Sequence, residues 1–519
     1  MFKGLRAYFP FAVLYLYTLL PIWLDFHTRI GLELSHSSWA LLSAGAVSFI
    51  ALLFPMHSRL YASAVFLLVY IPSGLRVLHY YIFGKLLDKG AAFAVFDTDP
   101  AEAAGFVTGY ANRASVAVLT ILLAAFFYAF KRVRSIDGTP HMEGLRQFFF
   151  VLLAVAGARG MFTSPRYRFA AFELYEHYYQ YYNVLNIADR KARKFGPFKD
   201  IRMVLEGPQV IVFAIGESDA REHHSLYGYS RDTDGALAGV KGRLYAFANV
   251  ATPHPMTITA LQKVLTLATF DDMGPLKAKG SVINLFNDAG FKTFWLDNNM
   301  ARTSKGRFVA AIAEDAAVAK FEQDIGAYPG FGDAKLLPAL ASALGDPAPR
   351  KAIFLHLRGS HWSYADRYPP DAAAFRGASD SRLEKIDHYD NSVAYAMDIV
   401  AKMVGMLGAR GGVSSFLYFP DHGEDAISRD SCFCHSSTVK KDNMFEIPFI
   451  LWLSDGYASA RPGFVGALSK YLGRKFNTQD FPHAAADLAG VSADGIDWNK
   501  SPFSADYDEP VFHIIKTLF

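Results

Sequence analysis

Apolar residues in the first third of the chain form long uncharged runs separated by short polar segments. A helix needs about 20 mostly apolar residues to cross a bilayer. The pattern predicts an N-terminal bundle of five transmembrane helices, at about 7–24, 38–55, 60–82, 114–130 and 146–162. Arg76 interrupts the third run, so it must snorkel to the outer interface or face a partner such as a lipid phosphate. The fifth run is the shortest, and a re-entrant or interfacial helix is the alternative there.

Lysine and arginine in the short loops indicate how such a bundle is oriented, because these residues accumulate on the cytoplasmic side. If the N-terminus is cytoplasmic, the inner segments carry seven of them and the outer loops carry four. Five spans that start inside place the rest of the chain outside. We therefore expect a transmembrane domain at 1–162 and an exported domain after it, which in a bacterium lies in the periplasm or at the cell exterior.

An aromatic stretch follows the last predicted span. Residues 166–183 read RYRFAAFELYEHYYQYYN and include six tyrosines. Tyrosine collects at membrane–water interfaces because it has an apolar body and a polar tip. We expect a helix on the outer leaflet, followed by the basic, Pro- and Gly-containing linker at 189–199, so that 163–204 connects the two domains. A buried aromatic helix of the exported domain is the alternative.

The pattern changes from residue 205 onward. Short apolar runs at 210–215, 293–296, 352–357, 415–419 and 449–453 alternate with helical periods at 257–269, 282–289 and 389–407. Continuous apolar strands that alternate with helices favour a mostly parallel sheet covered on both faces. The fold class is therefore α/β, with a domain at 205–519.

Composition and charge narrow the possible classes. The formal net charge is only +3, so no nucleic-acid partner is indicated. Apolar residues make up 52% of the chain, which excludes intrinsic disorder. Two cysteines, Cys432 and Cys434, are too few for a disulfide-based fold. We expect two unpaired thiols in a loop, with a local bridge as the alternative.

Polar residues follow several of the predicted strands. In a parallel sheet, ligands bind outside the carboxyl ends of the strands. Glu217 follows one strand, Asn298 and Asn299 follow another, and the pair Asp421 and His422 follows a third. Carboxylate oxygens and neutral imidazoles are ligands for zinc or manganese. The sequence therefore predicts a metal site at this edge.

Several motifs together resemble those of the membrane-bound phosphoethanolamine transferases, which belong to the alkaline-phosphatase/sulfatase superfamily. The motifs, in order, are GES at 216–218, SLYGYSRDT at 225–233, TPHPMTI at 252–258, HLRGSH at 356–361, RYP at 367–369, YDNS at 389–392, DHGE at 421–424 and IPF at 447–449. The runs SLYGY and TITALQKVLT are most similar to the branch that decorates the lipopolysaccharide inner core. The resemblance extends over nearly the whole chain.

The resemblance implies roles for individual residues. The expected metal ligands are Glu217, Thr257, Asp421 and His422. Thr257 is also the expected nucleophile, with Thr252 and Ser218 as weaker candidates. His361 and His435 are expected to act in acid–base catalysis or to hold a second metal. The expected substrate-binding residues are His254, Asn298, Asn299 and His356. His356 is also a candidate member of the His361–His435 group.

The same resemblance implies the reaction. We expect phosphoethanolamine to pass from phosphatidylethanolamine to a glycolipid, either lipopolysaccharide core or lipid A, through a zinc-activated threonine. One zinc ion is expected, a second is the alternative, and manganese is less favoured. The expected protein is a monomer of the bacterial inner membrane with a periplasmic catalytic domain.

Three other functions are compatible with parts of this pattern. A phosphoglycerol transferase of the lipoteichoic-acid type has the same plan, and another periplasmic glycan could be the acceptor. A true sulfatase needs a C/S-x-P-x-R motif, which the stretch 250–260 lacks. A non-enzymatic membrane sensor would be expected to lose metal ligands, yet all four are present.

Overall fold

A computed structural model describes residues 196–240, 243–299, 307–321, 332–426, 434–435 and 441–510, together with 174–180, 182 and scattered residues between 75 and 131. The chain divides into two compact units, Met1–Tyr181 and Tyr182–Phe519. Nearly all of the five predicted transmembrane helices lie outside the described residues, so their number remains a prediction. The described residues within the predicted span 114–130 are helical.

The aromatic stretch contains a helix at 174–182, of which residue 181 is not described. Tyr175, Tyr178, Tyr179 and Tyr182 are exposed on it, and the rings of Tyr175 and Tyr179 stack 6.4 Å apart. The position of this helix, at a membrane surface or packed in the exported domain, remains a prediction.

The second unit is built on a central sheet. Within the described residues the sheet has seven strands in the order β3-β9-β8-β2-β7-β5-β6. Their bounds are β2 Gln209–Gly216, β3 Arg243–Ala246, β5 Lys292–Asp297, β6 Val318–Lys320, β7 Arg350–His356, β8 Val413–Pro420 and β9 Ile450–Leu453. The five strands from β8 to β6 are parallel, whereas β9 runs antiparallel to β8 and β3 antiparallel to β9. This confirms the predicted α/β domain with a mostly parallel sheet.

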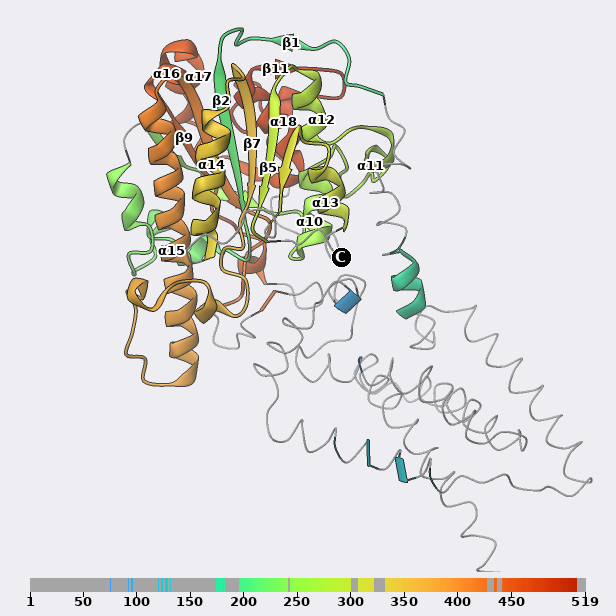
Figure 1. The fold of residues 1–519 in the computed structure, drawn as a ribbon, viewed down its shortest axis with the longest axis vertical. Coiled ribbons are helices and arrows are strands. Elements are labelled where there is room, and N and C mark those ends of the chain that lie inside the picture. Colours follow the sequence, from blue (N-terminus) through green and yellow to red (C-terminus); the bar gives the residue numbers. More distant parts are fainter. Residues whose placement is uncertain are drawn as a thin grey trace, which may run out of the picture. The chain divides into compact units, whose positions relative to one another are not determined.

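Helices cover both faces of this sheet (Figure 1). Side chains alternate along β2, so that Ile211 and Phe213 enter one core and Val210 and Val212 enter the other. The first core packs against α10 Thr257–Val264, α12 Val282–Asp288, α13 Arg307–Ala313 and α18 Phe481–Ala489. The second packs against α14 Leu336–Gly345 and α15 Ser381–Arg410. The central strand is therefore buried on both faces, as its continuous apolar sequence requires.

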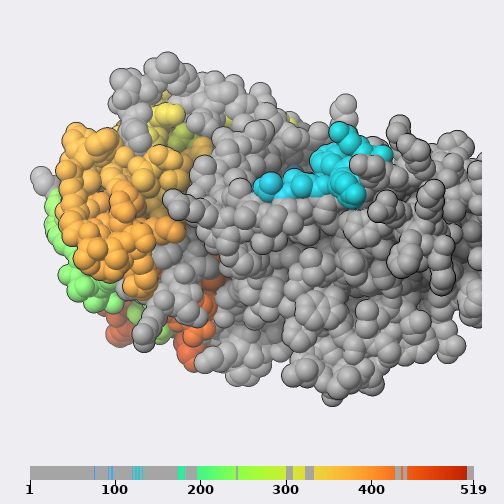
Figure 2. Space-filling view, turned by 90° about the horizontal axis from the view of Figure 1, so that it is seen from below, coloured from blue at the N-terminus to red at the C-terminus, as the bar shows by residue number. Residues whose placement is uncertain are grey.

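Shorter elements complete the domain. They are β1 Arg202–Met203, which pairs with β11 Val491–Ser492, β4 Asn249–Ala251, which pairs with β10 Lys475–Asn477, and the helices α11 Pro275–Ala278, α16 Asp455–Ala460 and α17 Pro462–Leu468. Within the described residues, α15 is the one helix long and apolar enough to span a bilayer, but it packs against β8 and α14 as a core helix. The orange surface around the start of α15 is visible in Figure 2.

Candidate metal centre and active site

The candidate site lies where β2 and β8 end. Glu217 directly follows β2, and Asp421 and His422 directly follow β8. The two strands are parallel neighbours in which Gly216 pairs with Pro420, and the Asp421 backbone N–H donates to the Gly216 carbonyl at 3.0 Å. This register brings side chains that are far apart in the sequence to the same edge of the sheet.

Four predicted ligands form one compact group. His422 Nε2 lies 3.1 Å from Glu217 Oε1 and 3.5 Å from Asp421 Oδ2. Thr257 Oγ1 lies 3.2 Å from Glu217 Oε1 and 3.3 Å from His422 Nε2. The donor atoms of the two carboxylates and the imidazole all lie within 4.8 Å of one another. The structure therefore brings together the four residues that the sequence predicted as metal ligands.

The group fits a divalent cation. Glu217, Asp421 and His422 are buried, and Asp421 Oδ2 has no hydrogen-bond partner among the described residues. A buried carboxylate oxygen without a partner is costly unless a cation or a proton satisfies it. Two carboxylates, one imidazole and one hydroxyl also supply the four nitrogen and oxygen ligands of a tetrahedral zinc site.

The pKa values of Asp421 and His422 also indicate a site suited to a cation. Burial and the charge of Glu217 raise the pKa of Asp421 to about 7. Burial lowers the pKa of His422, but the carboxylates of Asp421 and Glu217 outweigh it and raise this pKa to about 10. Without a metal, the protein thus compensates the two carboxylates with protons. Metal binding would displace such protons, so metal affinity should rise with pH.

Thr257 occupies the first position of α10, and its hydroxyl faces Glu217 and His422. Thr252 is fully buried and donates its hydroxyl hydrogen to the Asp421 carbonyl. Ser218 is fully buried too, and its hydroxyl lies 3.1 Å from Glu217 Oε1. Because Thr257 is only half-buried, it is the most accessible of the three candidate nucleophiles.

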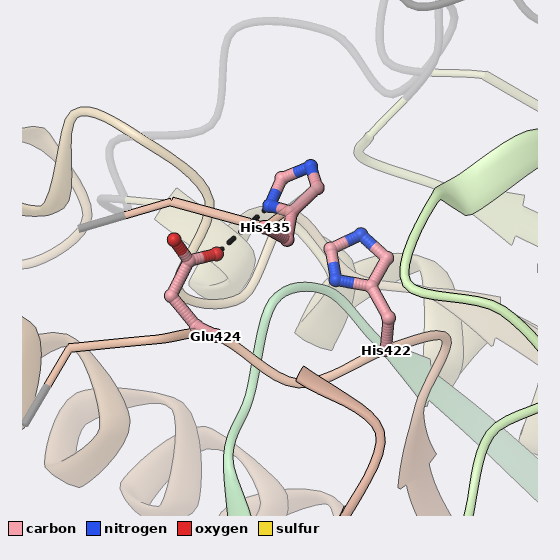
Figure 3. A group of neighbouring side chains, drawn as sticks. All are labelled: His422, Glu424 and His435. Atoms are coloured by element: carbon pink, nitrogen blue, oxygen red, sulfur yellow. Dashed lines mark hydrogen bonds and ion pairs between the residues drawn. The ribbon is translucent and has the colours of Figure 1, made fainter. Parts of the chain in front are cut away.

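A second group of titratable residues adjoins the first, and His422 belongs to both. His435 Nδ1 lies 2.8 Å from Glu424 Oε2, and the rings of His422 and His435 are 4.0 Å apart (Figure 3). The ring of His361 lies 6.5 Å from that of His435. The Tyr364 hydroxyl donates to the other oxygen of Glu424 at 2.9 Å. His361 and His435 thus lie near each other, as expected.

A short β-bridge between Asp425 and Cys434 holds His435 in this place. The Asp425 backbone N–H donates to the Cys434 carbonyl at 3.0 Å, and Lys441 Nζ lies 2.7 Å from Asp425 Oδ2. Cys434 is disulfide-bonded, and Cys432 is the only other cysteine in the sequence. The expectation that both thiols are unpaired is therefore wrong for Cys434, whereas Cys432 lies outside the described residues.

His356 does not join His361 and His435 in the described contacts. It is fully buried at the end of β7, and its Nδ1 lies 3.0 Å from Asp297 Oδ2 at the end of the neighbouring strand β5. Its Nε2 faces the Asn299 amide at 3.3 Å. These contacts link His356 to Asn299 and Asp297, and its expected role in substrate binding remains a prediction.

The remaining predicted substrate-binding residues differ in their surroundings. Asn299 Nδ2 donates to Glu217 Oε2 at 2.8 Å, which places Asn299 at the metal group. Asn298 turns away and donates to Asp333 Oδ1 at 2.9 Å. The same carboxylate accepts the backbone N–H groups of Arg358 and Gly359, so Asn298 supports a loop. His254 is half-buried, three residues before Thr257.

Two residues of the site were not among the predicted ones. Glu424 lies in the DHGE run, and its carboxylate two residues after His422 in that motif was the sequence signal that could have pointed to it. The structure shows that this carboxylate is buried. Asp297 is the first polar residue after the apolar run of β5. Its role was not visible in the sequence, because it depends on the parallel register that pairs Asp297 with His356.

An α/β domain with carboxylates, imidazoles and a threonine gathered at the carboxyl edge of its sheet defines a member of the alkaline-phosphatase-like class. A family model described as Sulfatase matches residues 209–491, which is more than half of the chain. The chain belongs to the sulfatase family.

Relatives within this family are named as phosphoethanolamine transferases. The phosphoethanolamine transferase EptC of Escherichia coli strain K12 is 32% identical over 58% of this chain and 54% of its own length, so the chain spans about half the length of that relative. The phosphoethanolamine transferase CptA of Salmonella typhimurium is 27% identical over 88% of this chain and 84% of its own length.

Solved structures are similar as well. The periplasmic domain of E. coli EptC, in complex with zinc, has a TM-score of 0.55 and 29% identity, over 61% of this chain and 92% of that domain. The integral membrane lipooligosaccharide phosphoethanolamine transferase EptA of Neisseria meningitidis has a TM-score of 0.74 over 95% of this chain and 97% of its own. At 17% identity, the latter similarity concerns the fold.

Proposed function

We propose that this protein transfers phosphoethanolamine from phosphatidylethanolamine to a glycolipid, either lipopolysaccharide core or lipid A, with Thr257 as the nucleophile. The observation that carries the proposal is the accessible Thr257 hydroxyl set against Glu217 and His422 at the edge of the sheet. The names of EptC and CptA support the phosphoethanolamine group. The zinc complex of the EptC domain supports zinc as the metal.

Thr257 Oγ attacks the phosphorus of the donor, and its proton passes to a neighbouring base of the group. The bond from phosphorus to the diacylglycerol oxygen breaks, diacylglycerol leaves with a proton, and phosphoethanolamine remains esterified to Thr257. A zinc ion held by Glu217, Asp421, His422 and Thr257 would supply a Lewis acid that lowers the pKa of the threonine hydroxyl. Backbone N–H groups in the first turn of α10 are oriented to stabilise the charge on the phosphoryl oxygens.

In the second half of the reaction, an acceptor oxygen displaces Thr257. We assign His435 the role of taking the proton of that acceptor, and the contact of 2.8 Å between its Nδ1 and Glu424 supports this role because it orients the ring. The ring of His361 lies 6.5 Å from that of His435, and His361 is the second candidate for proton transfer. A second zinc ion in the His422–Glu424–His435 group is the alternative use of these residues.

The membrane assignment belongs to the same proposal. Donor and acceptor are both lipids, so an enzyme that joins them gains from being anchored where they are. We place five helices in the bacterial inner membrane, with the N-terminus in the cytoplasm and the catalytic domain of a monomer in the periplasm. The exposed tyrosines of the helix at 174–182 support an interfacial position for that segment.

A phosphoglycerol transferase is the second candidate, because a metal-activated threonine suits either headgroup. The experiment is to express the protein in a Gram-negative host with labelled phosphatidylethanolamine and to record intact mass spectra of the lipopolysaccharide. Wild-type protein should add the mass of one phosphoethanolamine, and Thr257→Ala should add none. Thr257→Ser is the matched control and should keep part of the activity. Equal modification by wild type and Thr257→Ala would refute the nucleophile, and label from phosphatidylglycerol instead would favour the second candidate.

A further inference from the structure

A chain of hydrogen bonds runs from the core of the domain to Glu217. Trp295 Nε1 donates to Asp297 Oδ2 at 2.9 Å, and His356 Nδ1 lies 3.0 Å from the same oxygen. His356 Nε2 lies 3.3 Å from Asn299 Nδ2, which donates to Glu217 Oε2 at 2.8 Å. These contacts join the ends of three adjacent strands, β5, β7 and β2. The other Glu217 oxygen faces Thr257 and His422.

The direction of each bond follows from chemistry. The Glu217 carboxylate can only accept, so the Asn299 atom beside it must be the amide nitrogen. That nitrogen carries a second hydrogen, which is directed at His356 Nε2, and the imidazole therefore accepts there. The remaining ring nitrogen, Nδ1, then carries the hydrogen that is donated to Asp297. One arrangement of hydrogens is consistent with all three side-chain contacts, from Glu217 to Asn299, from Asn299 to His356 and from His356 to Asp297.

The arrangement is rigid because its base is buried. Asp297 and His356 are fully buried, and the Asp297 Oδ1 atom accepts the Asn299 backbone N–H at 2.8 Å. Asp297 thus holds Asn299 twice, once through the backbone and once through the imidazole. Turning the Asn299 amide would place its oxygen against the Glu217 carboxylate, which is repulsive. Asn298, the adjacent residue, is committed to Asp333 instead.

We propose that Asp297 and His356 are positioning residues, which hold the Asn299 amide on Glu217 and thereby fix the orientation of this metal ligand. The inference rests on the proposed function in one respect, namely that Glu217 binds the metal. It replaces the expected substrate-binding roles of His356 and Asn299 with a role in aligning a ligand. Partners that orient a metal ligand commonly change metal affinity about 10- to 100-fold when they are mutated.

The test is a double-mutant cycle on the full-length protein in detergent. The variants are Asp297→Asn, Asn299→Ala and the double variant, and zinc affinity is measured by competition with a chromophoric chelator. In Asp297→Asn, whichever way the new amide turns, its NH2 group meets another hydrogen-bond donor. Asp487→Asn is the matched control, because Asp487 is a buried carboxylate that bonds Arg461 and Ser501 instead of residues of this site.

We expect each single variant to lower zinc affinity about 10- to 100-fold. The double variant should be no more than about twofold weaker than the weaker single variant, because both changes act through one amide. Asp487→Asn should lower thermal stability without changing zinc affinity. The KM for phosphatidylethanolamine should be unchanged in the zinc-saturated single variants.

Two results would overturn the inference alone. The first is full additivity of the losses of zinc affinity in Asp297→Asn and Asn299→Ala. The second is unchanged zinc affinity with a raised KM, which would make Asn299 a substrate-binding residue. A different result bears on the proposed function: if Glu217→Gln itself leaves zinc affinity unchanged, Glu217 is no ligand, and the metal site fails together with the positioning role.

Discussion

Gly359 offers a sharp test of how the backbone holds the metal group. It has a φ of +47°, and a Cβ added there would lie 2.7 Å from the Glu217 carbonyl oxygen and 2.9 Å from the Glu217 nitrogen. The next residue, Ser360, donates its backbone N–H to the same carbonyl at 3.0 Å. Gly359→Ala should therefore strain the loop and displace the backbone that carries Glu217.

The magnitude has two parts. A left-handed conformation costs a residue with a Cβ about 1–2 kcal/mol relative to glycine. Overpacking against an element that cannot easily move costs a further amount of about 1–3 kcal/mol. Gly377 has a φ of +90° with nothing within 4 Å of an added Cβ. Gly377→Ala therefore carries only the first cost and is the matched control.

The assay is urea unfolding of both full-length variants in detergent, followed by tryptophan fluorescence, because Trp295 and Trp452 are buried in the catalytic domain. Gly359→Ala should lose about 2–5 kcal/mol of unfolding free energy and Gly377→Ala about 1–2 kcal/mol. Zinc affinity should fall in Gly359→Ala alone. Equal losses in the two variants, or unchanged zinc affinity in Gly359→Ala, would refute the claim that the close approach at Glu217 matters.

Three further outcomes are expected. Thr257→Ala should abolish transfer without unfolding the domain, whereas Thr257→Ser should retain measurable transfer; circular dichroism and lipopolysaccharide mass spectra check both. His435→Ala should lower kcat about 100-fold at unchanged zinc affinity of the Glu217 group, because it removes a proton-transfer residue; an unchanged kcat would contradict that role. His224 is buried between Asp219 and Asp234, whose charges outweigh burial and raise its pKa to about 10. The contribution of protonated His224 to stability is complete below pH 6.5 and is lost as pH rises toward 10. Wild type should therefore lose more unfolding free energy between pH 7 and 10 than His224→Gln. Parallel plots of unfolding free energy against pH for the two proteins would exclude this contribution.

The strands of the central sheet could be predicted because burial on both faces makes them continuous apolar runs. The runs at 210–215, 293–296, 352–357 and 415–419 lie within or close to β2, β5, β7 and β8. Edge strand β3 was missed, since Arg243–Ala246 is only partly buried and its sequence has no such run. The parallel direction followed from the alternation with helices, but the strand order depends on contacts that no local pattern contains.

Helix ends were predicted less well. The period at 257–269 suggested a longer helix than α10, which ends at Val264. The Thr266 hydroxyl bonds the Gln262 carbonyl and accepts the Ala268 N–H, so a local turn replaces the helix. In the other direction, α15 starts eight residues before the predicted 389, at a cap formed by the Asp380 side chain.

In the site, residues next to strand ends could be identified and one group among them could be predicted, whereas the surroundings of His356 could not. Glu217, Asp421 and His422 were expected together, and the structure places them together. His356 was grouped with His361 because the two lie five residues apart in one motif. The strand β7 ends between them, so one side chain remains in the core while the other lies in the loop beyond it.

The position of β2 in the sheet has a consequence for how this domain is made. It is the first strand of the central sheet along the chain, yet it lies in the middle and pairs with β7 and β8, which begin only at Arg350 and Val413. As the chain is made, this eight-residue apolar strand must therefore wait for partners on both edges, and the second partner, β8, begins only at Val413. Glu217 at its end meets Asp421 only when β8 arrives, so the metal site can close only after both neighbours of β2 are in place, while β9 and β3 still have to be added at one edge.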